Sequence, residues 1–171
     1  LTRRRIENKI KALNINDFYI CSLSTETIVY KGMFLAEQLS EFYPDLLDPD
    51  FKSKFAIYHQ RYSTNTFPTW SLAQPFRVLA HNGEINTLKG NINWMSAHEP
   101  RITHPFFNER INDLKPILDP DASDSASLDA AFELLVQTDR DLPMAKSMII
   151  PEAWSNRPEM SEELKNMYAY C

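Results

Sequence analysis

Apolar residues recur at helical spacing in several stretches of the chain, most clearly near its amino-terminal end. Ile6, Ile10 and Leu13 follow one another at intervals of four and three among basic residues. This spacing predicts an amphipathic helix over residues 2–13, whose basic side chains form either a solvated face or an anion-binding surface. Further helices are predicted over residues 34–42, 86–97 and 143–150, and after Ser161.

A second pattern, short runs of β-branched and aromatic residues bounded by polar turns, predicts strands in the first half of the chain. The first two runs are joined by Ser24-Thr25-Glu26, which favours a hairpin. Because strands come first and helices gather later, the order is typical of an α+β fold rather than of alternating βαβ units. The predicted strands cover residues 18–23, 27–30, 55–59 and 76–80.

Residues 100–124 are rich in Pro, Asp and Asn and predict irregular structure, after which Ser125 is a good N-cap for a helix. The residues expected on the apolar face of this helix are Leu128, Phe132, Leu135 and Val136. Asp129 and Glu133 are expected to face away from the core.

Composition and charge narrow the possible functions. The chain has 171 residues, of which 43% are apolar and 24% charged, and its formal net charge of −5 excludes a generically basic nucleic-acid binder. No run approaches the roughly 20 apolar residues that a membrane helix needs. We therefore expect no nucleic-acid partner and no membrane. With no secretory segment, we expect a reducing, cytoplasmic location.

The sequence predicts neither a metal site nor a nucleotide site. Its two cysteines, Cys21 and Cys171, are too few for a disulfide framework or a cysteine-rich metal site. The four histidines lack the i, i+4 pairing of a metal-binding helix, and the three glycines fit neither a phosphate-binding loop nor a dinucleotide fingerprint. We expect no metal and no cofactor in this segment.

Three polar clusters could carry chemistry, and the first is HQRYSTNTFP at residues 59–68. Arg61 offers a planar guanidinium that suits a carboxylate. The alternative is an ordinary surface ion pair, which contributes little to stability.

The other two clusters also allow a structural and a functional interpretation. In HNGEIN, residues 81–86, Asn82-Gly83 is either a tight hairpin turn or a pair of converging donors, as an oxyanion hole requires. In DASDSAS, residues 121–127, the polar side chains either cap a helix or present Asp124 to a ligand ammonium group.

Taken together, the stretches HQRYSTNTFPTW, LAHNGEINTLKGNINW and DASDSASLD resemble the glutaminase domain of glutamate synthases. That domain is a class II glutamine amidotransferase of the N-terminal nucleophile (Ntn) hydrolase superfamily. The resemblance is clearest over residues 55–95 and 119–154 and is looser over the first 50 residues.

The resemblance implies a role for each of five residues. Arg61 would bind the α-carboxylate of glutamine, and Thr64 would line the same pocket. Asn82 and Gly83 would form the oxyanion hole, and Asp124 would bind the α-amino group. A zwitterionic head group suits this set, because it needs one cation and one anion held apart, while the amide carbonyl points at two donors.

The resemblance also implies a fold and a missing nucleophile. The superfamily has a four-layer αββα sandwich, and the nucleophile of the class II amidotransferase family is an N-terminal Cys whose own α-amine can act as the base. Residue 1 here is Leu. We therefore expect residues 1–171 to be an internal segment of a single amidotransferase domain, with an incomplete sandwich that lacks its first strands. Alone, the segment is expected to be inactive.

By the same resemblance, the parent enzyme would hydrolyse glutamine to glutamate and ammonia, which is transferred reductively to 2-oxoglutarate. FMN, an iron–sulfur cluster and an electron donor (NADPH, NADH or ferredoxin) would act elsewhere in the parent. The implied partners are glutamine or glutamate, the rest of the synthase chain, and a small electron-donating subunit or ferredoxin. The location would be the cytoplasm, or the plastid in a photosynthetic eukaryote.

Two alternatives remain open. Without its nucleophile, the segment could be a non-catalytic binding or assembly module. It could also belong to another class II amidotransferase, one that makes glucosamine phosphate, phosphoribosylamine or asparagine, although NTFP at residues 65–68 and NTLKGN at residues 86–91 favour glutamate synthase.

Overall fold

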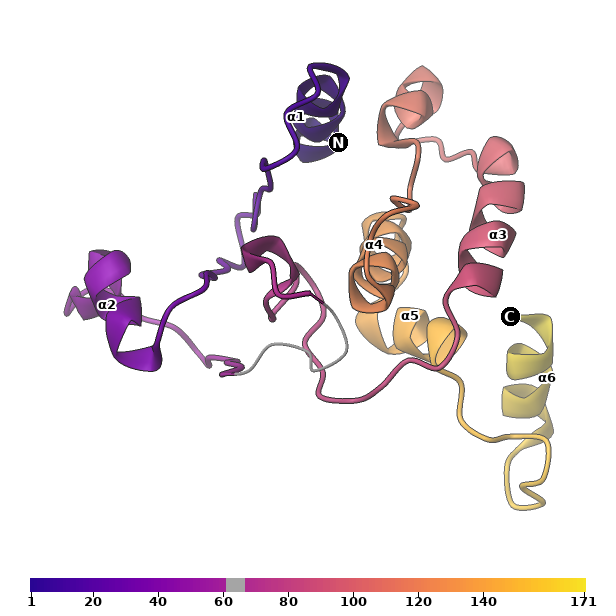
Figure 1. Ribbon diagram of the computed structural model, residues 1–171. Helices are drawn as coiled ribbons and strands as arrows, with labels where there is room; N and C mark the ends of the chain where they lie inside the picture. The colour runs from indigo at the N-terminus through magenta and orange to yellow at the C-terminus, as the bar shows by residue number, and fades with distance from the viewer. Residues whose placement is uncertain (61–66) are drawn as a thin grey trace.

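The computed structural model describes residues 1–60 and 67–171, and over these ranges the regular structure is entirely helical. The α-helices are α1 (Thr2–Ala12), α2 (Leu39–Phe42), α3 (Lys89–His98), α4 (Asp124–Gln137), α5 (Leu142–Ile149) and α6 (Glu162–Tyr170). The 3-10 helices are η1 (Ala36–Gln38), η2 (Pro44–Leu47), η3 (Trp70–Leu72), η4 (Glu99–Arg101) and η5 (Asn108–Leu114). Helix α4 lies near the middle of the molecule, and α2 and α6 lie at opposite extremes (Figure 1).

Most of the predicted helices form close to their expected bounds, because their start signals are local. The Asp141 side chain accepts a hydrogen bond from the Met144 N–H (2.7 Å) at the start of α5, which has Pro143 in its first turn. The Ser161 hydroxyl accepts from the Leu164 N–H (3.3 Å) and caps α6, as predicted. Within the stretch 100–124, predicted to be irregular, η5 adds a 3-10 helix.

Two predictions about α4 are wrong. Its N-cap is Ser123 rather than Ser125: Ser123 has an extended backbone, and its hydroxyl accepts from the Ala126 N–H (3.1 Å). Asp129 does not face away from the core, because it is completely buried. Its carboxylate is directed at backbone N–H groups of another segment, and those hydrogen bonds replace the water that an exposed Asp would have.

The four predicted strands are also wrong for the described residues, none of which lies in a strand. Strand residues need a neighbouring strand for their backbone hydrogen bonds, and these segments find other partners. The Val29 N–H donates to the Ser22 hydroxyl (3.1 Å), so a side chain links the two segments of the expected hairpin. The Phe76 N–H donates to the Leu79 carbonyl oxygen (2.8 Å) and closes a turn inside the run that predicts a strand.

The apolar core lies where α1, η5 and α4 meet. Phe107, Ile111 and Leu114 form its buried centre, and the partly buried residues packed against them are Leu1, Ile102 and Leu134. Helix α5 packs on α4 on another side, as Figure 1 also shows. The core therefore holds α4 firmly between its neighbours.

Beside this core, charged side chains connect α1 to the rest of the chain. Glu7 accepts hydrogen bonds from Arg3 (2.7 Å) and from Arg77 (2.8 Å), and Arg3 also pairs with Glu133 of α4. Arg77 in addition donates to the Ile20 carbonyl oxygen (2.9 Å) and lies over the Tyr19 ring. In the described part of the chain, no helix has the length and apolar character needed to cross a membrane.

Candidate functional site

The Asn82-Gly83 loop does not form the tight hairpin turn that its sequence allows. A type I′ turn needs positive φ at both central residues, and neither Asn82 nor Gly83 has one. A Cβ atom placed on Gly83 would meet no atom closer than His81 Nδ1, at 3.9 Å. Neither backbone conformation nor crowding therefore explains the glycine, whereas close approach of a ligand would explain it.

His81 organises this loop through its backbone and its ring. Its N–H donates to the Gln74 side-chain oxygen (2.9 Å), and its Nδ1 atom accepts from the Gly83 N–H (3.2 Å). The ring reaches α4 as well, since Nε2 lies 2.6 Å from the Ser125 hydroxyl. The loop that holds Asn82 and Gly83 is thus attached to the first turn of α4.

Asp124 occupies that first turn, half-buried and directly beside Ser125. Its Oδ1 atom accepts from the Ser125 backbone N–H (2.5 Å) and from the Ser125 hydroxyl (3.1 Å). A continuous set of hydrogen bonds therefore runs from Gly83 through His81 and Ser125 to Asp124. Two of the three polar clusters in the sequence come together here.

Asp129, one turn further along α4, fixes the segment that precedes the loop. Its Oδ1 atom accepts from the N–H groups of Val78 (2.9 Å) and Leu79 (3.1 Å), and Oδ2 lies 4.0 Å from Arg77 Nη1. Burial raises the pKa of Asp129, while the backbone donors and Arg77 act in the opposite direction. Sequence reasoning missed the role of this residue, because nothing in the local pattern of α4 indicates that it accepts hydrogen bonds from a segment about fifty residues earlier.

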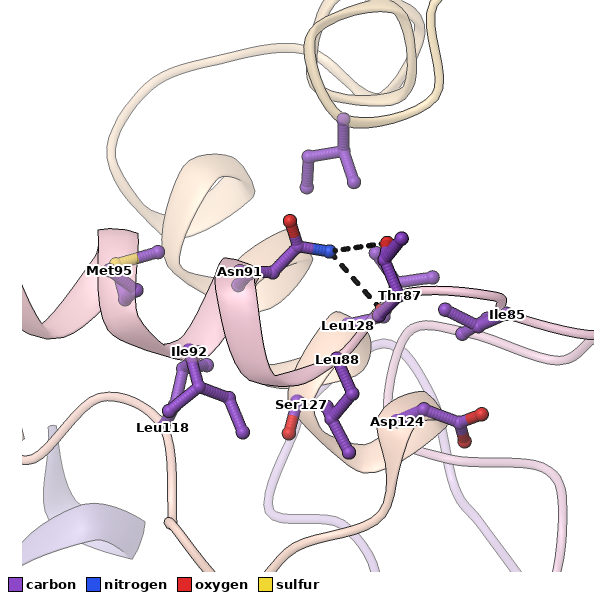
Figure 2. Close-up of a pocket in the computed structure, with 12 residues that line it drawn as sticks. Ile85, Thr87, Leu88, Asn91, Ile92, Met95, Leu118, Asp124, Ser127 and Leu128 are labelled. Carbon is purple, nitrogen blue, oxygen red and sulfur yellow. Dashed lines mark hydrogen bonds between the residues drawn. The ribbon is translucent and has the colours of Figure 1, made fainter.

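A pocket of about 220 Å³ lies between α3 and the first turns of α4 (Figure 2). Asp124 and Ser127 line it from α4, and Leu88 and Asn91 line it from the start of α3. The Ser127 hydroxyl is buried and has no hydrogen-bond partner among the described residues. The rest of the wall is mostly apolar and includes Ile85, Ile92, Met95, Leu118 and Leu128.

Arg61 and Thr64, the two residues expected to bind the substrate carboxylate, lie outside the described residues. The oxyanion pair and Asp124 are thus the part of the expected site that the structure describes.

Cys21 is not suited to the nucleophile role. Cys21 is half-buried, and its burial raises the pKa of its thiol, which opposes formation of the reactive thiolate. Cys171 is exposed at the last position. An iron–sulfur cluster needs several grouped thiolates. The described residues do not fit one, because they contain no group of three or more His, Cys, Asp or Glu side chains that could hold a metal.

A family profile described as "Glutamine amidotransferases class-II" matches residues 1–171. The chain belongs to the class II glutamine amidotransferases. The resemblance of its three polar clusters to this family is therefore confirmed over the whole chain, including the looser first 50 residues. Class membership supports the Ntn-type fold class, although the described residues contain no sheet.

Three relatives connect the chain to glutamate synthases. It is 60% identical over 171 residues to the "Glutamate synthase [NADPH] large chain" of Azospirillum brasilense, covering 100% of this chain and 11% of the relative. It is 49% identical over 178 residues to the "Ferredoxin-dependent glutamate synthase" of Pyropia yezoensis, covering 99% of this chain and 11% of the relative. It is 47% identical over 174 residues to the "Ferredoxin-dependent glutamate synthase, chloroplastic" of Oryza sativa subsp. japonica. This match covers 99% of this chain and 11% of the relative. The chain thus spans about a tenth of the length of these enzymes.

Proposed function

We propose that this chain contributes the oxyanion hole and part of the substrate pocket to the glutaminase site of a glutamate synthase. The site would hydrolyse glutamine to glutamate and ammonia. Asn82 and Gly83 would stabilise the oxyanion, Asp124 would bind the α-amino group, and Arg61 and Thr64 would hold the α-carboxylate.

The observation that carries this proposal is the contact between the His81-Asn82-Gly83 loop and the first turn of α4. The loop and Asp124 are about forty residues apart in sequence, yet His81 Nε2 lies 2.6 Å from the hydroxyl of Ser125, the neighbour of Asp124. An oxyanion donor pair and an anion for the ammonium group must face the same small substrate, and this contact supports such an arrangement. The pocket beside Asp124 is not lined by Asn82 or Gly83, so it bears on Asp124 alone.

In the proposed reaction, a cysteine thiolate attacks the side-chain amide carbon of glutamine. Negative charge then develops on the amide oxygen, where the Asn82 side chain and the Gly83 N–H would donate hydrogen bonds. The C–N bond breaks as the leaving NH2 group takes up the proton that the cysteine thiol lost, and ammonia departs. Water then attacks the thioester, which releases glutamate and restores the thiol. Burial raises the pKa of the Cys21 thiol and so opposes formation of its thiolate, and the chain spans about a tenth of its relatives' length. The proposal therefore takes the thiolate from elsewhere in the synthase.

The rest of the proposed pathway lies outside this segment. The ammonia would be transferred to 2-oxoglutarate with electrons supplied by NADPH, NADH or ferredoxin, and FMN and an iron–sulfur cluster would bind elsewhere in the synthase. The names of the relatives support both NADPH and ferredoxin as donors. The chloroplastic relative supports a plastid location for a protein from a photosynthetic eukaryote, and the location proposed otherwise is the cytoplasm.

The decisive test is Asp124→Asn in the glutamate synthase large chain that contains this segment. Removing the charge leaves the α-ammonium group without its anion, so we expect KM for glutamine to rise by about 10- to 100-fold with a smaller change in kcat. The measurement is glutamate formation from glutamine under steady-state conditions.

The matched control is Asp121→Asn, which removes one negative charge from an exposed position three residues earlier. We expect its KM for glutamine to stay within about twofold of the parent value. A normal KM in the Asp124→Asn enzyme, or an equal rise in the two variants, would overturn the proposed role of Asp124 and with it the proposed site.

A further inference from the structure

The hydrogen bonds between Gly83 and Asp124 all run in one direction. The Gly83 N–H donates to His81 Nδ1 (3.2 Å), so a neutral His81 ring carries its proton on Nε2. That proton is donated to the Ser125 oxygen (2.6 Å), and the Ser125 hydroxyl donates in turn to Asp124 Oδ1 (3.1 Å). Every donor in the series has an acceptor, and the series ends on a carboxylate.

This series of hydrogen bonds connects the Gly83 N–H to the Asp124 carboxylate, and in the proposed site these two groups must keep a fixed separation. A hydrogen bond to a charged acceptor is stronger than one between neutral groups, and successive bonds polarise one another. The carboxylate at one end therefore strengthens the contact between Ser125 and His81, and the His81 ring limits how far the Gly83 N–H can move. The Gln74 side chain adds a second restraint, because it accepts from the His81 backbone N–H (2.9 Å).

We propose that His81 and Ser125 are positioning residues that hold the oxyanion loop in register with Asp124. This inference rests on the proposed function. Neither residue touches the substrate in this scheme: His81 acts through Gly83 and Asn82, and Ser125 acts through Asp124 and His81. The specific consequence is that the two side chains work as one unit, and loss of either has the effect of losing both.

The contact also determines what the loop must do during the reaction. In this structure the Gly83 N–H points at His81 Nδ1 at 3.2 Å, which is long for a hydrogen bond between N–H and an acceptor. A developing oxyanion is a stronger acceptor than a neutral ring nitrogen, so the N–H can turn to the substrate when charge appears. His81 thus keeps the donor nearby at little energetic cost to the catalytic step.

The test is a double-mutant cycle in the glutamate synthase large chain that contains this segment. His81→Ala and Ser125→Ala should each lower kcat for glutamine hydrolysis by about tenfold, while KM stays within about twofold, because misplaced oxyanion donors matter only in the transition state. The double variant should be no worse than about twofold below either single variant, since both changes interrupt the same series.

Ser123→Ala is the matched control, because the Ser123 hydroxyl caps the same helix through the Ala126 N–H, whereas the His81 ring bonds the Ser125 hydroxyl. Ser123→Ala should lower kcat only slightly. In the Ser123→Ala, His81→Ala double variant, the fold-change in kcat should equal the product of the two single fold-changes. The positioning role is refuted if the fold-changes in kcat caused by Ser125→Ala and His81→Ala multiply in the double variant. It is also refuted if Ser123→Ala lowers kcat as much as Ser125→Ala does.

Two further substitutions of His81 distinguish the contribution of its Nε2 atom to kcat from that of its Nδ1 atom. His81→Gln has an amide long enough to reach the Ser125 hydroxyl and should recover part of kcat. His81→Asn has a shorter amide that can accept only near the Nδ1 position and should stay close to His81→Ala. Equal activity of the Gln, Asn and Ala variants would contradict the assignment of the Ser125 contact.

Failure of this inference is distinguishable from failure of the proposed function through Asp124→Asn measured alongside. A raised KM in Asp124→Asn without coupling between His81 and Ser125 refutes only the positioning role. A normal KM in Asp124→Asn refutes the proposed site itself.

Discussion

Two regions of this chain differ sharply in how they bury their apolar residues. Of residues 14–60, all of which the structure describes, only Lys31 is buried. Over residues 102–137, buried side chains recur in η5, in the connection to α4 and in α4 itself: Phe107, Ile111, Leu114, Ile117, Leu118, Ser127, Asp129 and Phe132.

The difference reflects the kind of structure that each region's sequence favours. A helix satisfies its backbone hydrogen bonds within one segment and then needs only one apolar face covered. A strand needs a partner for its backbone, and that partner lies elsewhere in the sequence. Residues 14–60 contain three of the four runs that predict strands, yet Phe18, Ile28, Phe55 and Ile57 in these runs stay exposed among the described residues. Local patterning is therefore enough to form helices and too little to form a sheet.

The largest expected effect tests this contrast in burial directly. Phe107→Ala removes a side chain that is 5% exposed, and we expect the free energy of unfolding to fall by about 3–5 kcal/mol. Phe55→Ala makes the same change at a residue that is 74% exposed and should cost less than about 0.5 kcal/mol. Urea unfolding followed by circular dichroism measures both, and equal losses would remove the distinction between the regions.

A somewhat smaller effect tests the contact that joins α4 to the segment before the loop. Asp129→Ala removes the buried carboxylate that accepts from the N–H groups of Val78 and Leu79, so two hydrogen bonds to a charged acceptor are lost and we expect a loss of about 2–4 kcal/mol. Asp129→Asn keeps an oxygen at the Oδ1 position and should cost only about 1 kcal/mol.

Hydrogen exchange of the Val78 and Leu79 amides gives a local measurement for the same pair of variants. Exchange should accelerate in Asp129→Ala and stay nearly unchanged in Asp129→Asn. Similar acceleration in both variants would show that the negative charge, rather than the acceptor oxygen, stabilises this contact.

The smallest expected effect concerns Lys31, the one buried residue of the region 14–60. Its ammonium group donates to the Ser71 carbonyl oxygen (2.8 Å) and lies 4.7 Å from the centroids of the Tyr19 and Phe76 rings. Burial lowers the pKa of Lys31 to about 8. Between that value and the ordinary lysine pKa of about 10.4, the unfolded chain binds more protons than the folded one.

The contribution of Lys31 to the free energy of unfolding should therefore rise as the pH increases from about 8 to about 10, by an amount on the order of 1 kcal/mol. Above that range, Tyr19 works in the opposite direction, because burial raises its pKa to about 12. The measurement is the difference in unfolding free energy between the parent chain and Lys31→Met across this pH range. A difference that does not change with pH would show that Lys31 is not desolvated when folded.

The candidate site illustrates the same limit of local information. Asn82, Gly83 and Asp124 could be selected from sequence because motifs mark them, and the resemblance to class II amidotransferases is confirmed. Ser125 was recognised for the wrong reason, as a helix cap, whereas Ser123 caps the helix and Ser125 contacts His81. Asp129 was missed because its partners are backbone N–H groups of a segment fifty residues earlier, which no helical periodicity can indicate.

The amino-acid sequence by itself determined the family, the positions of α1, α3, α4, α5 and α6 to within a few residues, and the identity of the candidate site residues. These depend on short-range signals: apolar spacing, capping side chains and contiguous motifs. Only the tertiary structure decided which way Asp129 faces, that Asn82-Gly83 is not a hairpin turn, and that His81 and Ser125 connect the loop to Asp124. Those outcomes depend on hydrogen bonds between segments far apart in the chain, and such bonds exist only once the helices have packed.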